Sequence, residues 1–557
     1  MCRSSGILSR NGSRQIAANG DARMTTADLH RRPDRWVRPL DKRGPFFHDG
    51  GRSSRTRPPI PVLLAALPIL TVLLAMAALG RSAVVAGAAG LGVALLLAAT
   101  SFDLTSGSGG AVTVPLAARG IGAEVLHSTA TILWIILPAL AIYELQRRSG
   151  AIDRIRDLLT GLSKDRRILV LLIAWFFGLF MEGAAGFGTP VALGAPLLVG
   201  LGIPPVRAVV LALLGHASGV SFGAAGTPLL TQAAITGVPV GEIALFAALL
   251  HAATGGVLLL ALLWLADGRA LSRGDLGWGL AAAACFFIPS VALAALTGPE
   301  LATLGGALLG CGAFVLLLRR LRPVAGAERP RRAHLADLAP YLLILALVLI
   351  TRMIPTVQEP LSAAALRWTL PGGFSGSFQP LYHPGTMLAA GLIAGALLTG
   401  RGALLLPSVA AALRQLLPVA LALVIMLALA RVMVHSGMVV TLAAAAARTG
   451  EVWPMLAPAV GVLGTFVTGS ATTSNILFSE FQLSTAAVLA LPLPVMLAAQ
   501  TFGAGIGNIV APHNIIAGCA TVGIKGQEGR ILALTLAPCA VAVLTAGLLL
   551  IAAFALP

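Results

Sequence analysis

The sequence predicts an all-α polytopic membrane protein with two structural repeats that contain broken helices or re-entrant hairpins. One reason is composition, because 57% of the 557 residues are hydrophobic and only 11% are charged, whereas soluble domains carry about 25% charged residues. A second is that bilayer-length apolar runs recur without strict alternation, which indicates helices and not barrel strands. A third is that glycine and small polar residues interrupt such runs in each half. We expect about 12 to 14 transmembrane helices.

The chain begins with a polar stretch. Residues 1–59 are rich in arginine and lack apolar periodicity, which predicts a disordered basic N-terminal tail. Residues 60–318 form the expected first transmembrane half. Its apolar segments are expected at residues 61–80, 83–101, 127–146, 168–181, 191–202, 205–221, 228–237, 242–266, 277–297 and 300–318.

Two short basic loops orient the chain. Residues 319–338 form a linker with six arginines against two acidic residues, and residues 147–167 hold seven basic against three acidic residues. Short loops that are rich in Lys and Arg stay in the cytoplasm, so we expect both loops there. Because three spans separate the tail from loop 147–167, the tail is expected on the outside.

Residues 339–557 form the expected second transmembrane half. A long loop with proline, glycine and Trp368 at residues 355–382 is expected on the outer side. The apolar segments of this half are expected at residues 339–354, 385–400, 415–433, 434–447, 453–468, 485–500, 509–521 and 531–555.

Glycine and small polar residues interrupt the apolar pattern in four blocks. The first half contains Glu182–Pro190 and Phe222–Pro228, and the second half contains Thr468–Asn475 and Gly503–Asn514. Irregular backbone at bilayer depth survives only where protein or a water-filled cavity covers it. Paired interruptions in the two halves of a transporter point to its binding site, so we expect the broken helices to meet near the membrane midplane.

Glu182 is the only acidic residue between Asp165 and Glu242. A carboxyl group inside the membrane suggests a functional role, and its removal from water favours the neutral form, as a proton carrier requires. The alternatives are that Glu182 caps the helix after the break, or that it pairs with a lysine or an arginine.

The first two blocks supply glycines and helix starts. Gly186 and Gly188 permit a tight turn and a close approach to the backbone. Thr189 and Thr227 each precede a proline, which is favoured at the start of a helix. Free N–H groups at a helix N-terminus suit a carboxylate ligand. The alternative is that these glycines only allow close helix packing.

The last two blocks supply hydrogen-bonding side chains. In the third block these are Thr468, Ser470, Thr472, Thr473, Ser474 and Asn475. They suit a small hydroxy acid or Na⁺, although such hydroxyls also bond to their own helix. The fourth block adds Asn508, His513 and Asn514. His513 either titrates near neutral pH or serves as a plain hydrogen-bonding group.

Arg431 interrupts an apolar run at residues 416–434. Three interpretations remain open: it binds a substrate carboxylate, it pairs with Glu182, or it extends to the membrane interface. His216 is expected to be a packed core histidine. The five cysteines show no metal-binding spacing, so we expect neither a metal nor another cofactor.

These blocks resemble the signature segments of the L-lactate permease family of secondary transporters. The similar stretches are Glu182-Gly-Ala-Ala-Gly-Phe-Gly-Thr-Pro-Val-Ala192, Leu197-Leu-Val-Gly-Leu-Gly202, Phe222-Gly-Ala-Ala-Gly-Thr-Pro228 and Thr468-Gly-Ser-Ala-Thr-Thr-Ser-Asn-Ile-Leu-Phe478. The resemblance runs from about residue 127 to the C-terminus and is weakest between residues 270 and 380. It implies uptake of a 2-hydroxy-monocarboxylate (lactate or glycolate) by proton symport across the inner membrane, and a two-repeat fold with re-entrant hairpins, as in the wider ion-transporter superfamily.

The sequence departs from the family pattern in two places. Lactate-transporting members have an Asp where this chain has Ala471, and a Lys-Met-Ile-Ser-Pro-Gln stretch where it has Asn508-Ile-Val-Ala-Pro-His513. An acid and a base are both missing. Loss of one alone would strand a buried charge, which suggests that the two form a pair in those members. The substrate or the coupling ion is therefore expected to differ here, with Arg431 or His513 as a replacement for the lost charge.

We expect a secondary transporter of a small monocarboxylate in the bacterial inner membrane. The predicted partners are a small organic anion and the lipid bilayer, without nucleic acid. Proton coupling through Glu182 is the first hypothesis, and Na⁺ coupling or a different organic anion is the alternative. We expect no enzyme, because no Asp pair lies inside the spans. A channel is not favoured either, because neither a charged ring nor a carbonyl filter is visible.

Overall fold

Membrane-length helices make up most of the structure. The computed structural model describes residues 59–102, 104, 113–186, 188–322, 332–524 and 526–555, and all of them belong to one unit, Arg55–Pro557. Among these residues, twelve helices are long and apolar enough to cross a membrane. The predicted all-α polytopic fold is confirmed. The predicted N-terminal tail lies outside the described residues, apart from Pro59.

The first half contains two helices that break inside the membrane-length segments. Its elements are α1 Pro59–Ala77, α2 Ala83–Thr100, α3 Val114–Arg148, α4 Ala151–Thr160, α5 Arg166–Val170, η3 Leu171–Phe177, α6 Gly178–Ala184, α7 Thr189–Gly200, α8 Pro205–His216, η4 Ala217–Phe222, α9 Gly223–Thr236, α10 Val240–Asp267, α11 Arg273–Thr297 and α12 Ala302–Leu321. The breaks lie between α6 and α7 and between α8 and α9, as the glycine blocks predict.

The second half repeats this order of breaks. Its elements are α13 Arg332–Met353, α14 Pro355–Ala363, β1 Leu366–Leu370, β2 Phe374–Phe378, α15 Pro384–Leu398, η5 Gly402–Leu404, α16 Leu405–His435, α17 Met438–Ala446, η6 Ala447–Val452, α18 Trp453–Thr468, α19 Ala471–Val488, α20 Leu493–Ile506, η7 Gly507–Ile509, α21 Pro512–Thr521 and α22 Glu528–Ala555. The breaks lie between α18 and α19 and between α20 and α21.

One predicted span is wrong. The segment expected at residues 485–500 contains the end of α19 and the start of α20. The chain turns between them, where Ala490 has a φ angle of +54°. The turn is made of Ala, Leu and Pro, so it does not interrupt the apolar run that predicted a single span.

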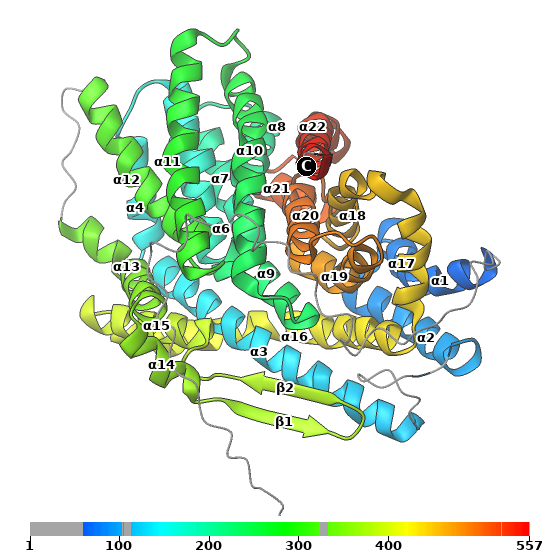
Figure 1. Ribbon diagram of the computed structural model, residues 1–557. Coiled ribbons are helices and arrows are strands. Elements are labelled where there is room, and N and C mark those ends of the chain that lie inside the picture. Colours follow the sequence, from blue (N-terminus) through cyan, green and yellow to red (C-terminus); the bar gives the residue numbers. More distant parts are fainter. Residues whose placement is uncertain are drawn as a thin grey trace, which may run out of the picture. The chain divides into compact units, whose positions relative to one another are not determined.

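A small β-hairpin was not expected in the loop at residues 355–382. β1 and β2 pair antiparallel within residues 355–382, with Leu366 opposite Phe378 and Leu370 opposite Phe374. Figure 1 shows the hairpin beside α3, and α3 lies next to the long helix α16. Phe374 is fully buried, and a Cβ on Gly120 of α3 would lie 2.3 Å from its ring. Because Gly120 has no side chain, the Phe374 ring of the hairpin can pack directly against α3.

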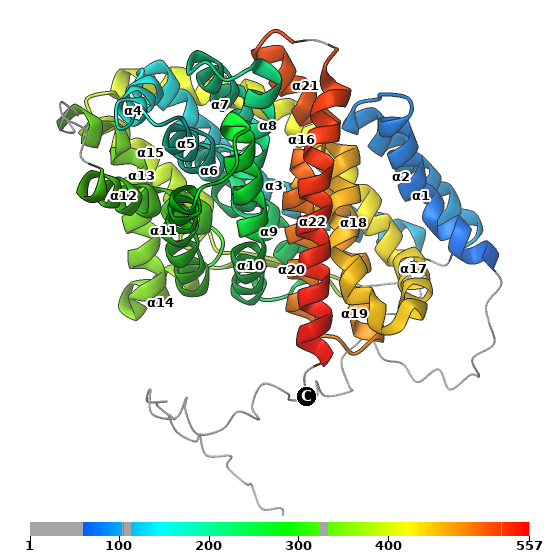
Figure 2. The same ribbon diagram turned by 90° about the horizontal axis from the view of Figure 1, so that it is seen from above.

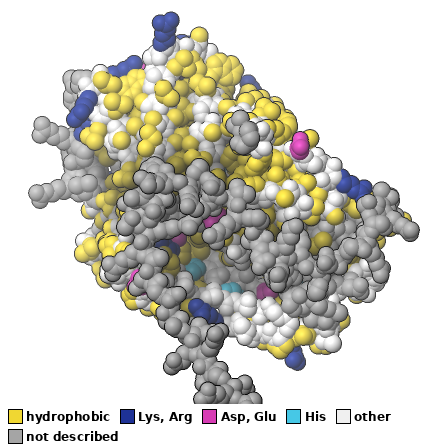
Figure 3. All heavy atoms as spheres, in the orientation of Figure 1, with side chains coloured by type: hydrophobic (Ala, Val, Ile, Leu, Met, Phe, Trp, Pro, Cys, Tyr) yellow, Lys and Arg dark blue, Asp and Glu magenta, His cyan; other side chains and the backbone are white. Residues whose placement is uncertain are grey.

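The helices place the loops at opposite ends of the bundle. In Figure 2, α4 lies at one end of the helices and α14 at the other, and α13 runs between them. The basic loop at residues 147–167 and the loop at residues 355–382 are thus separated as their predicted sides require. Figure 3 shows apolar side chains over much of the visible helix surface, with few charged ones between them, which suits contact with lipid.

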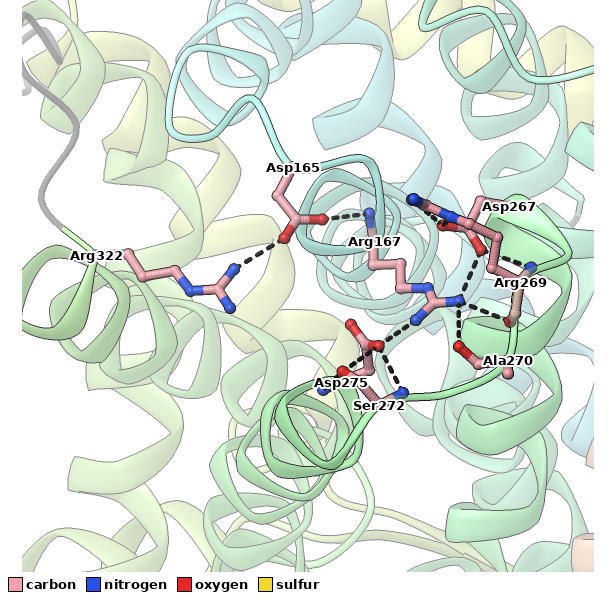
Figure 4. A network of polar contacts seen from close by, with 8 residues as sticks. All are labelled: Asp165, Arg167, Asp267, Arg269, Ala270, Ser272, Asp275 and Arg322. Carbon is pink, nitrogen blue, oxygen red and sulfur yellow. Dashed lines mark hydrogen bonds and ion pairs between the residues drawn. The ribbon is translucent and has the colours of Figure 1, made fainter.

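Arg167 ties the start of α5 to the turn between α10 and α11 (Figure 4). Its guanidinium donates to Asp267 at 2.7 Å and also to Asp275, and to the backbone carbonyl groups of Arg269 at 2.8 Å and Ala270 at 3.3 Å. The Arg167 side chain is only 8% exposed. One buried cation therefore bridges two carboxylates from two other helices, and Arg269 also pairs with Asp267 at 2.6 Å.

Replacing Arg167 with methionine is expected to destabilise the protein by about 3–5 kcal/mol, because among the described residues it leaves Asp275 without a cation and Asp267 with only the exposed Arg269. The matched control is Arg156→Met. Arg156 pairs with two exposed aspartates within or next to its own turn, so its loss should cost about 0–1 kcal/mol. Thermal unfolding of both purified variants measures the difference. Equal midpoints for the two variants would show that the buried network does not stabilise the fold.

Candidate functional site

The first block breaks the helical segment that starts at Arg166. After Ala184 the chain turns through Gly186 and Gly188, whose φ angles are +60° and +80°. This left-handed backbone favours glycine. The Thr189 hydroxyl donates to the Gly186 carbonyl at 2.8 Å and closes the turn. The predicted break and the predicted start of the next helix at Thr189 are both confirmed.

The second block bends the backbone more sharply. Ala224, Ala225 and Gly226 have φ angles of +44°, +54° and +82°, and left-handed backbone costs an alanine about 1–2 kcal/mol. Strain of this kind persists where the surroundings fix the backbone, and it clusters at ligand-binding segments. The Thr227 hydroxyl donates to the Ala224 carbonyl at 2.7 Å, so its proton is used inside this turn.

Glu182 lies in the last turn of α6 and faces the start of α9. Its exposed fraction is 5%. A Cβ built on Gly223 would lie 2.1 Å from its Oε1, and one on Gly186 would lie 3.4 Å away, so both glycines leave room for the carboxyl. Among the described residues Glu182 has no hydrogen-bond or ion-pair partner, and neither alternative role, as a cap or as an ion-pair partner, is seen. A buried carboxyl without a partner is far less costly when it is neutral.

The third block turns at Gly469, which has a φ angle of +70°. Ser470 caps α19 by accepting a hydrogen bond from the Thr473 N–H at 3.2 Å. The Thr468 hydroxyl donates to the carbonyl four residues earlier at 2.7 Å, and the Ser474 hydroxyl donates to a carbonyl of α18 at 2.9 Å. The hydroxyls of Thr468, Ser470 and Ser474 therefore form hydrogen bonds with backbone groups. This is the alternative to ligand binding that the sequence left open.

Other polar atoms of this block keep unused hydrogen-bonding capacity. The Asn475 amide nitrogen donates to the Pro228 carbonyl at 3.1 Å and to the Thr501 hydroxyl at 2.9 Å. The Asn475 Oδ1 atom is buried without a partner in the part of the chain that the structure describes. The hydroxyls of Thr472 and Thr473 likewise have no hydrogen-bond partner among the described side chains and backbone groups. These three oxygens can bind a ligand.

The fourth block joins η7 to α21. Asn514 donates from its side-chain nitrogen to Asn508 Oδ1 at 2.9 Å, and His216 Nε2 lies 3.3 Å from the same oxygen. His216 is buried, as predicted for a core histidine. The His513 side chain is exposed, and a Cβ on Gly469 would lie 2.8 Å from its Cβ. The fourth block therefore touches the turn of the third.

The broken helices of the two halves come together. The first and fourth blocks approach each other where a Cβ on Gly188 would lie 3.9 Å from Asn514 Oδ1. The second and third blocks are joined by the hydrogen bond from Asn475 to the Pro228 carbonyl. Together with the contact of Glu182 against the start of α9, these contacts link all four blocks into one site.

Arg431 lies away from this site, on α16. Its Nη1 donates to Glu480 Oε1 at 3.2 Å, its Nε lies 3.6 Å from Glu124 Oε2, and its Nη2 donates to the Ile235 carbonyl at 3.1 Å. The expectation that it pairs with Glu182 is therefore wrong. The side chain is 13% exposed, and its position relative to the membrane interface stays a prediction. Its role toward a substrate carboxylate stays a prediction.

A cavity of about 750 Å³ opens beside Arg431. Its walls come from α3, α9, the start of α10, the turn between α11 and α12, and residues 355–382. Ligand pockets are typically about 300–1,000 Å³, so this cavity accommodates a small acid with its water. Arg352 lies in another wall, where it pairs with Glu300 at 2.9 Å and stacks 3.7 Å from the centre of the Tyr382 ring.

His383 lines the same cavity but is not suited to carry protons near neutral pH. Burial, and to a lesser extent the nearby Arg352 guanidinium, lower the pKa of His383 to about 4. The imidazole is therefore neutral between pH 5 and pH 8. Its Nδ1 accepts a hydrogen bond from the Gly385 N–H at 3.3 Å at the start of α15, which is a structural role.

Sequence reasoning missed Glu124 and Glu480. The expected spans began at residues 127 and 485 and left both carboxylates outside the membrane, whereas α3 and α19 begin well before those positions. The signal that could have found them is an isolated acidic residue with apolar neighbours at helical spacing, by the same argument that singled out Glu182.

Comparison with known proteins identifies the family. A family model described as L-lactate permease matches residues 61–556. The chain belongs to the L-lactate permease family. It is a multi-pass membrane transporter of the bacterial inner membrane.

Curated members of the L-lactate permease family match most of the chain. An L-lactate permease of Streptococcus iniae is 31% identical and covers 76% of this chain and 90% of its own length. The glycolate permease GlcA of Escherichia coli K12 is 30% identical, and the L-lactate permease of the same strain is 28% identical; each covers 85% of this chain and 92% of its own length.

Two solved transporter structures were also matched. The YdaH transporter of Alcanivorax borkumensis gives a TM-score of 0.48 at 16% identity and covers 89% of this chain and 99% of its own. MtrF of Neisseria gonorrhoeae, described as an antimetabolite efflux pump, gives a TM-score of 0.45 at 16% identity and covers 88% of this chain and 94% of its own.

The two departures from the L-lactate permease pattern lie close together in the fold. Ala471 is buried at the start of α19 and packs in a small apolar cluster with Val220 and Ala504. Ala504 lies one helical turn before Asn508. The structure thus places Ala471 near the segment that contains Asn508.

One serine–histidine pair in this permease resembles a catalytic arrangement. Gly219-Val-Ser-Phe-Gly223 has the G-x-S-x-G spacing of hydrolases, so the expectation that the sequence contains no such segment is wrong. Ser221 Oγ lies 2.8 Å from His251 Nε2. The Ser221 hydroxyl is fully buried, however, and donates to the Thr501 carbonyl at 2.8 Å. Among the described residues, His251 Nδ1 has no partner that would orient a catalytic base. The pair therefore connects η4, α10 and α20 as a structural contact.

Proposed function

We propose that this protein imports a small 2-hydroxy-monocarboxylate, such as lactate or glycolate, together with a proton. The observation that carries the proposal is Glu182, a buried carboxyl without a described partner at the junction of two broken helices. The names of the relatives, lactate and glycolate permeases, support the substrate class.

The substrate anion lies between the turns at residues 182–190 and 468–478. The first turn offers the N-terminus of α7, where the Thr189 N–H already donates to the Gly186 carbonyl and Pro190 has no N–H, so it is the helix dipole that favours a carboxylate. The second turn offers the hydroxyls of Thr472 and Thr473 as donors or acceptors. The unpaired Asn475 Oδ1 accepts a hydrogen bond from the 2-hydroxyl of the substrate.

The proton binds to the carboxyl of Glu182. A protonated carboxyl beside a bound anion carries the same net charge as the empty site with an ionised carboxyl, so loading adds no net charge to the low-dielectric core. Movement of one repeat against the other then exposes the site to each side in turn. A carboxyl that is ionised while the anion is bound would add a second negative charge, which disfavours transport of the anion alone.

Coupling to Na⁺ is the second candidate, and the three unpaired oxygens of Thr472, Thr473 and Asn475 favour it, because hard cations bind oxygen ligands. Uptake by liposomes that contain the full-length protein separates the two. Radiolabelled L-lactate, glycolate and short acids without a 2-hydroxyl are tested with an imposed pH gradient, with and without Na⁺. We expect accumulation of the 2-hydroxy acids without Na⁺. A strict Na⁺ requirement contradicts proton coupling, and absence of uptake of every acid contradicts the substrate class.

A further inference from the structure

A second group of charged side chains is buried between α3, α16 and α19, outside the site of the four blocks. We refer to Glu124, Arg431, His435 and Glu480 as the Arg431 cluster. His435 Nε2 lies 3.1 Å from Glu124 Oε2, Arg431 Nε lies 3.6 Å from the same oxygen, and Arg431 Nη1 lies 3.2 Å from Glu480 Oε1. The exposed fractions of these side chains are between 6% and 16%.

The cluster holds more negative than fixed positive charge. Two carboxylates face one guanidinium, so its net charge is −1 when His435 is neutral and zero when His435 is protonated. A net charge in a desolvated site is costly, whereas a balanced and hydrogen-bonded set of charges is tolerated. One added proton would bring the net charge of the cluster to zero. Glu124 and His435 can accept it, because Glu124 Oε2 and His435 Nε2 already share a hydrogen bond.

No further charged group compensates the cluster within the described elements packed around it. α2, α9, α17 and β2 carry no ionisable side chain; α9 contributes the Ile235 carbonyl, and β2 contributes the Phe374 ring, whose centre lies 5.1 Å from that of His435. His127 lines the cavity one turn after Glu124 and stacks against Trp368. The remaining ionisable residues of α3 and η6 near this region are exposed, namely Arg119, Arg448 and Glu451.

The cluster is connected both to the cavity and to Glu182. Glu124 and Arg431 line the cavity, so water, protons and a small anion reach them. The helix α9 links the two acidic sites: Gly223 at its start lies against Glu182, and the Ile235 carbonyl near its end accepts the hydrogen bond from Arg431. A change in the ion pairs of Arg431 therefore acts on the same helix that packs against Glu182.

We propose that the Glu124–His435 pair is a second proton-binding site, which takes up a proton when an anionic substrate reaches Arg431 from the cavity. This inference rests on the proposed proton-coupled uptake of a monocarboxylate. The longest ion pair of the cluster, from Arg431 Nε to Glu124, breaks, and the substrate carboxylate takes its place on the guanidinium. The incoming proton binds between Glu124 and His435. The net charge stays at −1, because the anion and the proton enter together.

The decisive variant is Glu124→Gln, with Glu451→Gln as the matched control, since Glu451 is an exposed carboxylate in η6. Proton uptake by the full-length protein in detergent is counted at one fixed pH when L-lactate is added, with addition of buffer alone as the blank. We expect the wild type and Glu451→Gln to take up about one proton more per bound lactate than Glu124→Gln. Equal proton uptake by all three contradicts the inference.

Transport of radiolabelled L-lactate provides the second measurement. Glu124→Gln mimics a permanently protonated carboxyl, so exchange of internal for external lactate should persist while accumulation driven by a pH gradient falls. A gradient of one pH unit can drive roughly tenfold accumulation per proton, so the ratio should fall about tenfold in the variant, which keeps Glu182. Wild-type accumulation by Glu124→Gln overturns the inference. If Glu124→Gln does not fold, His435→Gln is measured in the same two assays, with the same expected losses.

Failure of the proposed function gives a different result. In that case wild-type liposomes accumulate no lactate, or require Na⁺, while proton uptake on addition of lactate in detergent still reports whether Glu124 and His435 bind a proton. Loss of lactate uptake in the wild type therefore does not count against the second proton-binding site, and loss of the titrating proton does not count against the substrate class.

Discussion

Replacing Glu182 with glutamine is expected to abolish the accumulation of lactate or glycolate driven by a pH gradient. Glutamine has nearly the same shape but cannot exchange a proton. Because Glu182 is buried and has no described partner, the neutral amide removes the cost of desolvating a charge, and the variant should unfold at the same temperature as the wild type or higher. The initial rate of uptake into liposomes, measured at several external pH values between 5 and 8, reports the effect.

The control for this variant is Glu242→Gln, an exposed carboxyl in the first turn of α10, which should transport normally. Gly223→Ala provides an independent perturbation, since its Cβ would lie 2.1 Å from Glu182 Oε1 and would displace the carboxyl. It should impair uptake although the carboxyl itself is retained. Unchanged uptake by Glu182→Gln across this pH range would end the proton-carrier role of Glu182.

The breaks in the helices could be predicted because their causes are local. Gly186, Gly188 and Gly469 adopt left-handed backbone that other residues avoid, and Thr189 is followed by a proline at the helix start. A short stretch of sequence therefore determines each turn. The turn near Ala490 was missed for the same reason, because apolar residues form it without the glycine or polar signal that marks the others.

Interactions between distant helices could not be predicted in the same way. Arg431 and Glu480 lie on α16 and α19, and Glu124 lies on α3, so their contact depends on how three helices pack. The sequence left three interpretations of Arg431 open, and Glu182 was the one protein partner among them. Only the fold shows that two other carboxylates are closer. Likewise, the hydroxyls of Ser470 and Ser474 are used by the backbone, and those of Thr472 and Thr473 are not.

Restoring the missing acid alone is expected to damage the protein severely. Ala471→Asp places a carboxylate in the apolar cluster with Val220 and Ala504, and an unpaired buried charge costs about 3–5 kcal/mol. The expected result is a lower unfolding temperature and a loss of transport. Ser470→Asp serves as the matched control, because an aspartate is well accepted at the position that caps α19.

Adding the base should reverse much of that damage. In Ala471→Asp combined with Asn508→Lys, the ammonium group replaces an amide one turn from Ala504 and can reach the new carboxylate. The free energy of unfolding that the double variant loses should be smaller than the sum of the losses of the two single variants. The difference should be about 0.5–3 kcal/mol, the usual range for residues that interact directly. Asn508→Lys alone should also destabilise, since it removes the oxygen near His216 and Asn514. Strict additivity of the two changes would mean that the two positions do not face each other, and that the acid and the base of other family members have separate roles.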